Sequence, residues 1–149
     1  MPSTRVLVVD DNRINREVLG AILATQDLMV DFAVDGQEAV ALATAVPYDL
    51  ILMDYQMPLM DGLTATALIR REEQRSAARS RAQLYIVSAC DEAEVGRRAQ
   101  VAGADGFIGK PIVFSHILAL AQTAASRGVA RRGGPTGLGS WDANRACAS

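Results

Sequence analysis

The sequence predicts a doubly wound α/β fold in which five parallel strands alternate with five helices. Short apolar, β-branched segments alternate regularly with segments of helical length. Several of the apolar segments are nearly continuous, which is typical of strands buried on both faces of a parallel sheet. The length of 149 residues suits one domain with a substantial core.

Five short apolar segments are expected to form the strands. They are RVLVVD (5–10), MVDFAV (29–34), DLILMD (49–54), LYIVSA (84–89) and GFIG (106–109). The first, third and fourth show little alternation of apolar and polar residues, which favours central positions in the sheet. The connections between parallel strands should be right-handed crossovers.

Five segments of helical length follow these strands. They are residues 13–25, 36–45, 62–73, 91–102 and 112–126. In the first, Ile14, Val18, Ala21 and Ile22 fall on one stripe, which predicts the face that packs on the sheet. The last segment is apolar on more than one face. It is either an Ala-rich core helix, or its outer side forms a partner or dimer surface with segments 91–102 and 106–109. Both interpretations stay open.

The composition of the chain changes near residue 126. Residues 1–125 are expected to form the domain, and residues 126–149 are rich in Gly and Arg with a single Trp. We expect this tail to be disordered because it has too few apolar residues to bury.

The composition also excludes several classes of protein. No apolar run approaches the roughly 20 residues that span a bilayer, and carboxylates follow the first four apolar residues, which excludes a secretory signal. Cys90 and Cys147 have no metal-ligand spacing, which favours a reducing cytoplasm. The net charge is −2. The basic residues of the second half are scattered, without interleaved aromatic residues, which disfavours nucleic acid as a partner.

Polar side chains stand at the carboxyl ends of four predicted strands. Asp10 and Asp11 end the first strand, Asp54 the third, Ser88 the fourth and Lys110 the fifth. Open α/β sheets bind ligands at this edge. Each aspartate alone could be a helix N-cap, but all five residues at successive strand ends indicate one site.

The chemistry of these residues indicates phosphoryl transfer. Three clustered carboxylates must protonate or bind a cation, and oxygen ligands with room for water suit Mg²⁺. An ionised aspartate beside such a metal can be the nucleophile that accepts a phosphoryl group. The Ser88 hydroxyl and the Lys110 ammonium can then bind phosphoryl oxygens. We therefore hypothesise an acyl phosphate on an aspartate.

Four motifs resemble those of a response-regulator receiver domain: VLVVDDNRINREV, DLILMDYQMPLMDG, IVSA and GADGFIGKP. The resemblance covers roughly residues 4–125 with the motifs in the right order. It implies a flavodoxin-like sheet order of 2-1-3-4-5. It also implies a phosphorylation-controlled signalling module that catalyses only its own phosphorylation and dephosphorylation, and not an enzyme acting on other substrates.

The resemblance assigns the acidic residues to phosphorylation and metal binding. It implies that Asp54 is the phospho-acceptor and that Asp11 and Asp54 bind Mg²⁺ directly. Asp10 would bind the ion through water, and the backbone carbonyl of Gln56 would complete the protein's ligands. Asp61, which precedes a glycine, is expected to cap the helix that begins at 62.

The remaining motif residues are assigned to the phosphoryl group and the switch. The resemblance implies that Ser88 and Lys110 bind the phosphoryl group, that Phe107 is the switch aromatic and moves inward on phosphorylation, and that the Lys110–Pro111 bond is cis. Ser88 stands where the family more often has Thr, and Phe107 where it often has Tyr. Lys110 is the one lysine beside fourteen arginines.

The residues that make up these motifs are most similar to those in the receiver domains of hybrid histidine kinases. This similarity implies a histidine kinase or a histidine phosphotransfer domain as phosphoryl donor. The output is expected to be a separate partner or another part of a longer chain. A homodimer through 91–102, 106–109 and 112–126 is a further possibility.

Two other classes share part of this chemistry. Aspartate-nucleophile, Mg²⁺-dependent phosphatases place an Asp-x-Asp pair after the first strand, whereas the two acids here are adjacent. Such enzymes also carry a cap insert, for which this chain has no long segment. A flavin-binding flavodoxin needs an anion-binding first loop, and this loop carries carboxylates.

Overall fold

The computed structural model describes residues 4–75, 81–89 and 93–133, without the side chains of 93, 94 and 127–133. The strands are β1 (Thr4–Val9), β2 (Leu28–Ala33), β3 (Leu50–Asp54), β4 (Gln83–Ala89) and β5 (Gly106–Lys110). The helices are α1 (Arg13–Leu23), α2 (Gly36–Ala45), α3 (Gly62–Gln74), α4 (Ala93–Ala102) and α5 (Phe114–Gly133). Each of the ten predicted elements is present.

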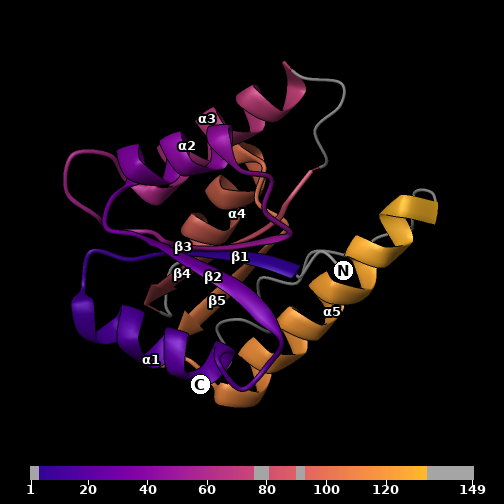
Figure 1. Cartoon of the computed structure of the whole chain (residues 1–149). Helices are drawn as coiled ribbons and strands as arrows, with labels where there is room; N and C mark the ends of the chain where they lie inside the picture. Colours follow the sequence, from indigo (N-terminus) through magenta and orange to yellow (C-terminus); the bar gives the residue numbers. More distant parts are fainter. Residues whose placement is uncertain (1–3, 76–80, 90–92, 134–149) are drawn as a thin grey trace.

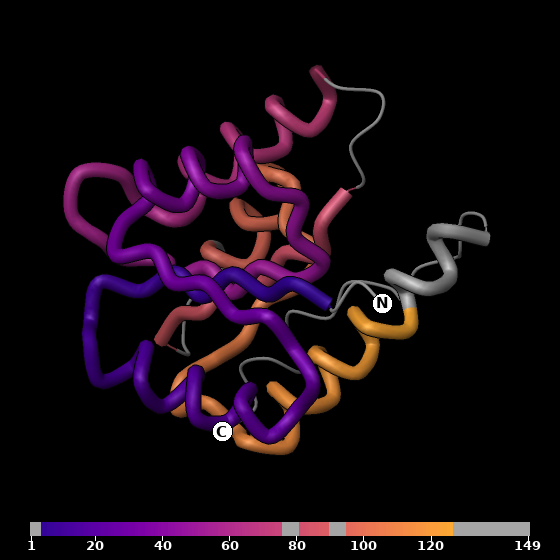
Figure 2. The backbone as a smooth tube through the Cα atoms, in the orientation of Figure 1, coloured from indigo at the N-terminus to yellow at the C-terminus, as the bar shows by residue number. Residues whose placement is uncertain are grey.

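The strands form one parallel sheet in the order β2-β1-β3-β4-β5, which confirms the predicted topology. Helices α1 and α5 cover one face of the sheet, and α2, α3 and α4 cover the other (Figure 1). The path of the backbone in Figure 2 shows the chain leaving β1 toward one edge and returning to β3 on the other side of β1. The order of the strands therefore reverses between β1 and β3, where open α/β sheets bind their ligands.

Two hydrophobic clusters fill the space between the sheet and its helices. In β1, Leu7 and Val9 belong to the cluster under α2, α3 and α4, whereas Val6 and Val8 belong to the cluster under α1 and α5. Successive side chains of a strand point to opposite faces. Because both faces are covered, every second position must be apolar on each side, and this produces the continuous runs in the sequence.

The predicted buried face of α1 is wrong. Ile14 is 68% exposed and Val18 is 49% exposed, while Leu19, Ile22 and Leu23 are buried. Leu19, Ile22 and Leu23 lie three and four residues apart, so they form a second apolar stripe on the same helix. This stripe carries the larger side chains and packs into the cluster under α1 and α5. Of the predicted stripe only Ile22 is buried, whereas Ile14, Val18 and Ala21 are exposed.

The last helix is longer than predicted. It continues to Gly133, seven residues past the predicted end, because its last turns contain Ala, Val and Arg, which a helix accommodates. Residues 134–149 lie outside the described residues, as do Cys90, Cys147 and the rest of the predicted tail. Within the described part of the chain, no helix combines the length and apolar character that a bilayer span needs.

A buried arginine of α3 joins two connections at the edge of the sheet where the strands begin. Arg70 is 8% exposed. Its guanidinium donates hydrogen bonds to Glu73, to Asp105 and to the carbonyls of Ala82 and Gly103, each at 2.8 Å. This network fixes the end of α3 against the segments that enter β4 and β5.

Candidate functional site

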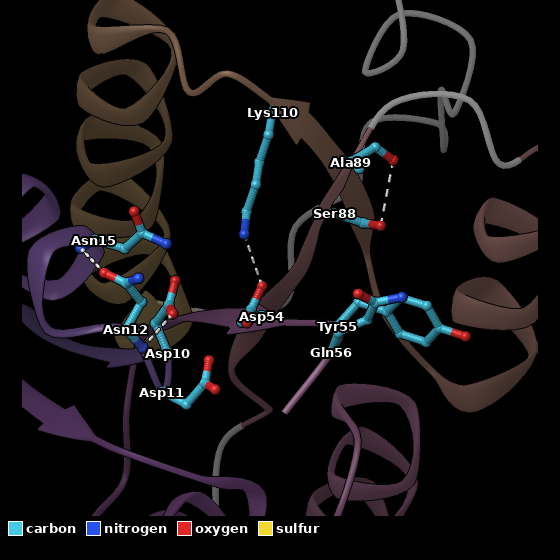
Figure 3. A pocket seen from close by; sticks show the side chains of 10 residues that line it. All are labelled: Asp10, Asp11, Asn12, Asn15, Asp54, Tyr55, Gln56, Ser88, Ala89 and Lys110. Atoms are coloured by element: carbon cyan, nitrogen blue, oxygen red, sulfur yellow. Dashed lines mark hydrogen bonds and ion pairs between the residues drawn. The ribbon is translucent and has the colours of Figure 1, made fainter. Parts of the chain in front are cut away.

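A crevice of about 240 Å³ opens at the carboxyl ends of β1, β3, β4 and β5 (Figure 3). It brings together six residues that the sequence predicted for the site, together with four others. Its lining consists of Asp10, Asp11, Asn12, Asn15, Asp54, Tyr55, Gln56, Ser88, Ala89 and Lys110. The carboxyl ends of parallel strands meet at one edge of the sheet, and this places residues up to 100 positions apart in one site.

Asp10, Asp11 and Asp54 form a cluster in which each offers an oxygen within 4.8 Å of the others. Asp10 and Asp54 are buried and Asp11 is exposed. Asp10 is not the N-cap of α1, because Asn12 takes that position and accepts a hydrogen bond from the backbone of Asn15. A cluster of hard oxygen ligands that opens to solvent fits a divalent cation such as Mg²⁺.

Asp10 is held by the start of α1. Its carboxylate accepts a hydrogen bond from the backbone N–H of Asn12 at 2.9 Å. Its own carbonyl accepts one from the Arg16 guanidinium at 2.8 Å. These two bonds fix the turn that follows β1, and with it the direction in which Asp10 and Asp11 face.

The surroundings of Asp54 disfavour the ionised form of its carboxyl group. Burial, followed by the charge of Asp10, raises the pKa of Asp54 from 3.8 to about 6, although Lys110 opposes the rise. The Nζ atom of Lys110 lies 3.1 Å from Oδ1 of Asp54. In the metal-free protein Asp54 is therefore ionised at neutral pH but protonates about two pH units above an ordinary aspartate.

Ser88 and Phe107 occupy different surroundings. Ser88 lines the crevice and is 5% exposed, and its hydroxyl donates to the neighbouring carbonyl of Ala89 at 3.3 Å. Phe107 is 4% exposed, does not line the crevice, and packs in the cluster under α2, α3 and α4. The aromatic ring is thus inside the protein in this structure.

Two predictions about the turns beside the crevice are confirmed. The Lys110–Pro111 peptide bond is cis. Asp61 caps α3 by accepting a hydrogen bond from the Thr64 backbone at 2.8 Å. The next residue, Gly62, lies so close to the Asp54 carbonyl that a Cβ atom there would collide with it. A glycine is therefore required where α3 begins behind the end of β3.

Residues 6–122 match the family of the response regulator receiver domain. The chain belongs to this family. Its relatives include hybrid signal transduction histidine kinase G of Dictyostelium discoideum, 36% identical over 110 residues. They also include the signal transduction histidine-protein kinase BarA of Escherichia coli K12, 35% identical over 109 residues. Each alignment covers 72% of this chain but only 3% and 11% of those proteins, so the receiver domain corresponds to a small part of each.

Solved structures share the fold of this receiver domain. The receiver domain of Ssk1 from Saccharomyces cerevisiae, crystallised with the histidine phosphotransfer protein Ypd1, is 26% identical with a TM-score of 0.78 and covers 85% of this chain and 92% of that one. The response regulator domain of Thermotoga maritima CheB is 33% identical with a TM-score of 0.71 and covers 84% and 98%. The chain is therefore a receiver domain of two-component or phosphorelay signalling, and a phosphatase is not favoured.

Two features of this receiver domain were not found from its sequence. Asn12 and Asn15 line the crevice, and an Asn just before a helix could have been recognised as an N-cap. The hydroxyl of Tyr55 accepts a hydrogen bond from Arg98 of α4 at 3.3 Å. Because 43 residues separate the two, no local pattern in the sequence indicates this second contact.

Proposed function

We propose that Asp54 accepts a phosphoryl group from a phosphohistidine, and that the receiver domain formed by residues 1–125 switches a partner-binding surface in response. One observation carries the proposal. An aspartate with a raised pKa, two further carboxylates and the single lysine of the chain meet in one crevice at the point where the strand order reverses.

The proposed step is a displacement at phosphorus. A carboxylate oxygen of Asp54 attacks the phosphorus atom, and the bond from phosphorus to the donor's imidazole nitrogen breaks. The imidazole leaves with the electron pair, and Asp54 becomes an acyl phosphate. Lys110, which already holds Oδ1 of Asp54, then pairs with a phosphoryl oxygen. Ser88 reaches another oxygen once its hydroxyl leaves the Ala89 carbonyl. Attack by water on the acyl phosphate would release inorganic phosphate and restore the Asp54 carboxylate.

The carboxylate cluster fits Mg²⁺, and the proposed function includes it. Asp11 and Asp54 would hold the ion directly, Asp10 through water, and Gln56 through its backbone carbonyl. The ion would neutralise charge on the transferred phosphoryl group. Without a cation, Asp10 and Asp11 both act to raise the pKa of Asp54.

The donor would dock on an apolar rim around the crevice. Ile14 and Val18 on α1, Leu59 after β3, and Val113 and Phe114 at the start of α5 are each between 49% and 82% exposed. Four of these residues lie in a connection or a first helical turn that supplies the crevice lining or directly follows it, and Val18 lies one turn after Ile14 on α1. A histidine kinase or a histidine phosphotransfer domain with an apolar face around its histidine is complementary to this rim. The two cysteines of the chain, which have no metal-ligand spacing, favour the cytoplasm for this exchange.

The output would be read from the surface of α4, β5 and α5. We propose that phosphorylation biases this surface between two arrangements, with Phe107 as the internal aromatic residue that changes its packing. A separate output protein, or a second copy of the chain, would bind there. Light scattering before and after phosphorylation tests the homodimer: a mass that doubles with phosphorylation supports it, and a constant monomer mass excludes it.

Acetyl phosphate tests the central step directly. The protein is incubated with Mg²⁺ and acetyl phosphate, and the intact mass is followed for a phosphoryl adduct. We expect the adduct in the wild type and in Asp61→Asn, and its loss in Asp54→Asn. If wild-type protein gains no adduct from acetyl phosphate or from a phosphorylated histidine phosphotransfer protein, or if Asp54→Asn gains it equally, the proposal is wrong.

A further inference from the structure

A second hollow lies between α3 and α4, away from the lining of the crevice. It has a volume of about 560 Å³ and is formed by two rows of residues spaced four apart. On α3 the row is Leu63 and Ala67, and on α4 Arg97 is followed by Val101. Residues spaced by four lie along one side of a helix, so the hollow extends over about one turn of each helix and forms a short groove between them. We call it the α3–α4 groove.

The groove combines an apolar surface with two positive charges. Leu63 is 7% exposed and forms its floor, whereas Val101 is 89% exposed and is the most exposed large apolar side chain among the described residues. Arg97 and Arg98 are both exposed. Among the described side chains neither makes an ion pair, although Arg5, Arg13, Arg70, Arg75 and Arg81 each pair with a carboxylate.

We propose that the α3–α4 groove binds an acidic amphipathic helix of a partner protein. Its position favours a helix, because a hollow lined by the side chains of two helices can take up the apolar side of a third helix. Its charges favour carboxylates, because two arginines with no acidic partner in the described structure can form charge-assisted hydrogen bonds with them. The apolar residues of the bound helix would cover Val101 and Ala67.

The groove also has a direct connection to the crevice. Arg98, which lines the groove, donates a hydrogen bond to the hydroxyl of Tyr55, the residue after Asp54. The backbone of Tyr55 is held on both sides, by Val87 and by Gly62. Its side chain is therefore the part that can respond to Arg98. A carboxylate that engages the Arg98 guanidinium would weaken its bond to Tyr55 and release the ring beside the phospho-acceptor.

Docking and phosphorylation should consequently influence each other. If the bound helix changes the stability of the acyl phosphate, phosphorylation must change the affinity of the helix by the same factor. This coupling rests on the proposed phosphorylation of Asp54, whereas the docking itself does not. The two can be separated because docking is measured on protein without phosphoryl group.

Docking is tested by titration with a synthetic peptide and detection by ¹⁵N–¹H NMR. The probe is a capped amphipathic helix of about five turns, with leucines along one side flanked by glutamates. We expect chemical-shift changes at Ala67 and Val101, and about tenfold weaker binding by Arg97→Gln/Arg98→Gln, since two exposed ion pairs are lost. Arg71→Gln, an exposed α3 arginine outside the groove, should bind like the wild type.

Several results would overturn the docking. The docking is wrong if the peptide does not bind, or if the chemical-shift changes are confined to the crevice or the apolar rim. It is also wrong if a peptide with glutamine in place of glutamate binds equally well, or if Arg71→Gln weakens binding as much as Arg97→Gln/Arg98→Gln does. The coupling is tested by the affinity of the peptide for the protein with and without the phosphoryl adduct. Phosphorylation should change this affinity in the wild type but not in Tyr55→Phe, which keeps the ring and lacks the hydroxyl. An equal change in Tyr55→Phe would exclude the path through Arg98.

Discussion

Replacing Asp54 by asparagine should stabilise the metal-free protein at neutral pH. Burial, together with the charge of Asp10, raises the pKa of Asp54 from 3.8 to about 6. A carboxyl group with a higher pKa in the folded state binds its proton more tightly there than in the unfolded chain. Ionising it therefore costs stability, and asparagine removes that cost while keeping the shape of the side chain.

The size of the effect follows from linkage. The rise of the pKa to about 6 corresponds to roughly 3 kcal/mol of stability that the wild type lacks above pH 6. As the pH falls from 6 toward 3.8, the folded protein takes up the proton first, so the cost shrinks. Below 3.8 Asp54 is protonated in both states and contributes nothing. The advantage of Asp54→Asn should thus be largest near pH 7.5 and small near pH 4.

Urea unfolding in the presence of a chelator measures this difference. Wild type, Asp54→Asn and the control Asp61→Asn are compared at several pH values between 7.5 and 4. The control also loses one charge, but asparagine caps a helix as well as aspartate does, so its stability should change by less than about 0.5 kcal/mol. An equal stability of wild type and Asp54→Asn at pH 7.5, or an advantage that does not change with pH, would refute the reasoning.

Three other substitutions test the site and the fold. Lys110→Arg should still gain the phosphoryl adduct but transmit the signal poorly, so an unchanged effect of phosphorylation on partner binding would contradict it. Arg70→Met should lower the unfolding free energy by about 3 kcal/mol, because the nearly buried Glu73 loses its ion pair and Asp105 keeps only the one with Arg81, while Arg71→Met on the exposed side should change little. Gly62→Ala should cost about 1–3 kcal/mol in urea unfolding, because its Cβ meets a backbone carbonyl, whereas Gly20→Ala meets only the tip of an aromatic side chain.

The sequence predicted the elements and most of the crevice because both depend on local patterns. Continuous apolar runs identify parallel strands, and the residue that ends each run lies at the ligand-binding edge of the sheet whatever the detailed packing. Asp10, Asp54, Ser88 and Lys110 could therefore be assigned to one site before any distance was known. The cap at Asp61 is local in the same way, because the residue that accepts from Thr64 is three positions away.

The features that escaped prediction depend on non-local packing. The helix α1 carries two apolar stripes, and only the shape of the sheet beneath decides that Leu19 and Leu23 are buried while Ile14 is not. The Arg70 network joins residues up to 35 positions apart. The bond between Arg98 and Tyr55 spans 43. Side-chain contacts at these separations leave no periodicity in the sequence. From the sequence alone, Arg70 and Arg98 therefore cannot be distinguished from the arginines that make no such contact.

In the proposed function, the single lysine of the chain serves two states of the same site. Before phosphorylation its ammonium neutralises Asp54 at 3.1 Å. After phosphorylation the charge lies farther out, on the phosphoryl oxygens, so the cation must move without losing its partner. An ammonium on a flexible four-carbon stem can follow one oxygen in either state. An arginine fork would hold both carboxylate oxygens at once and would take the space beside Asp10 and Asp11. Fourteen arginines serve elsewhere in the chain, but position 110 needs a cation that can change its partner atom.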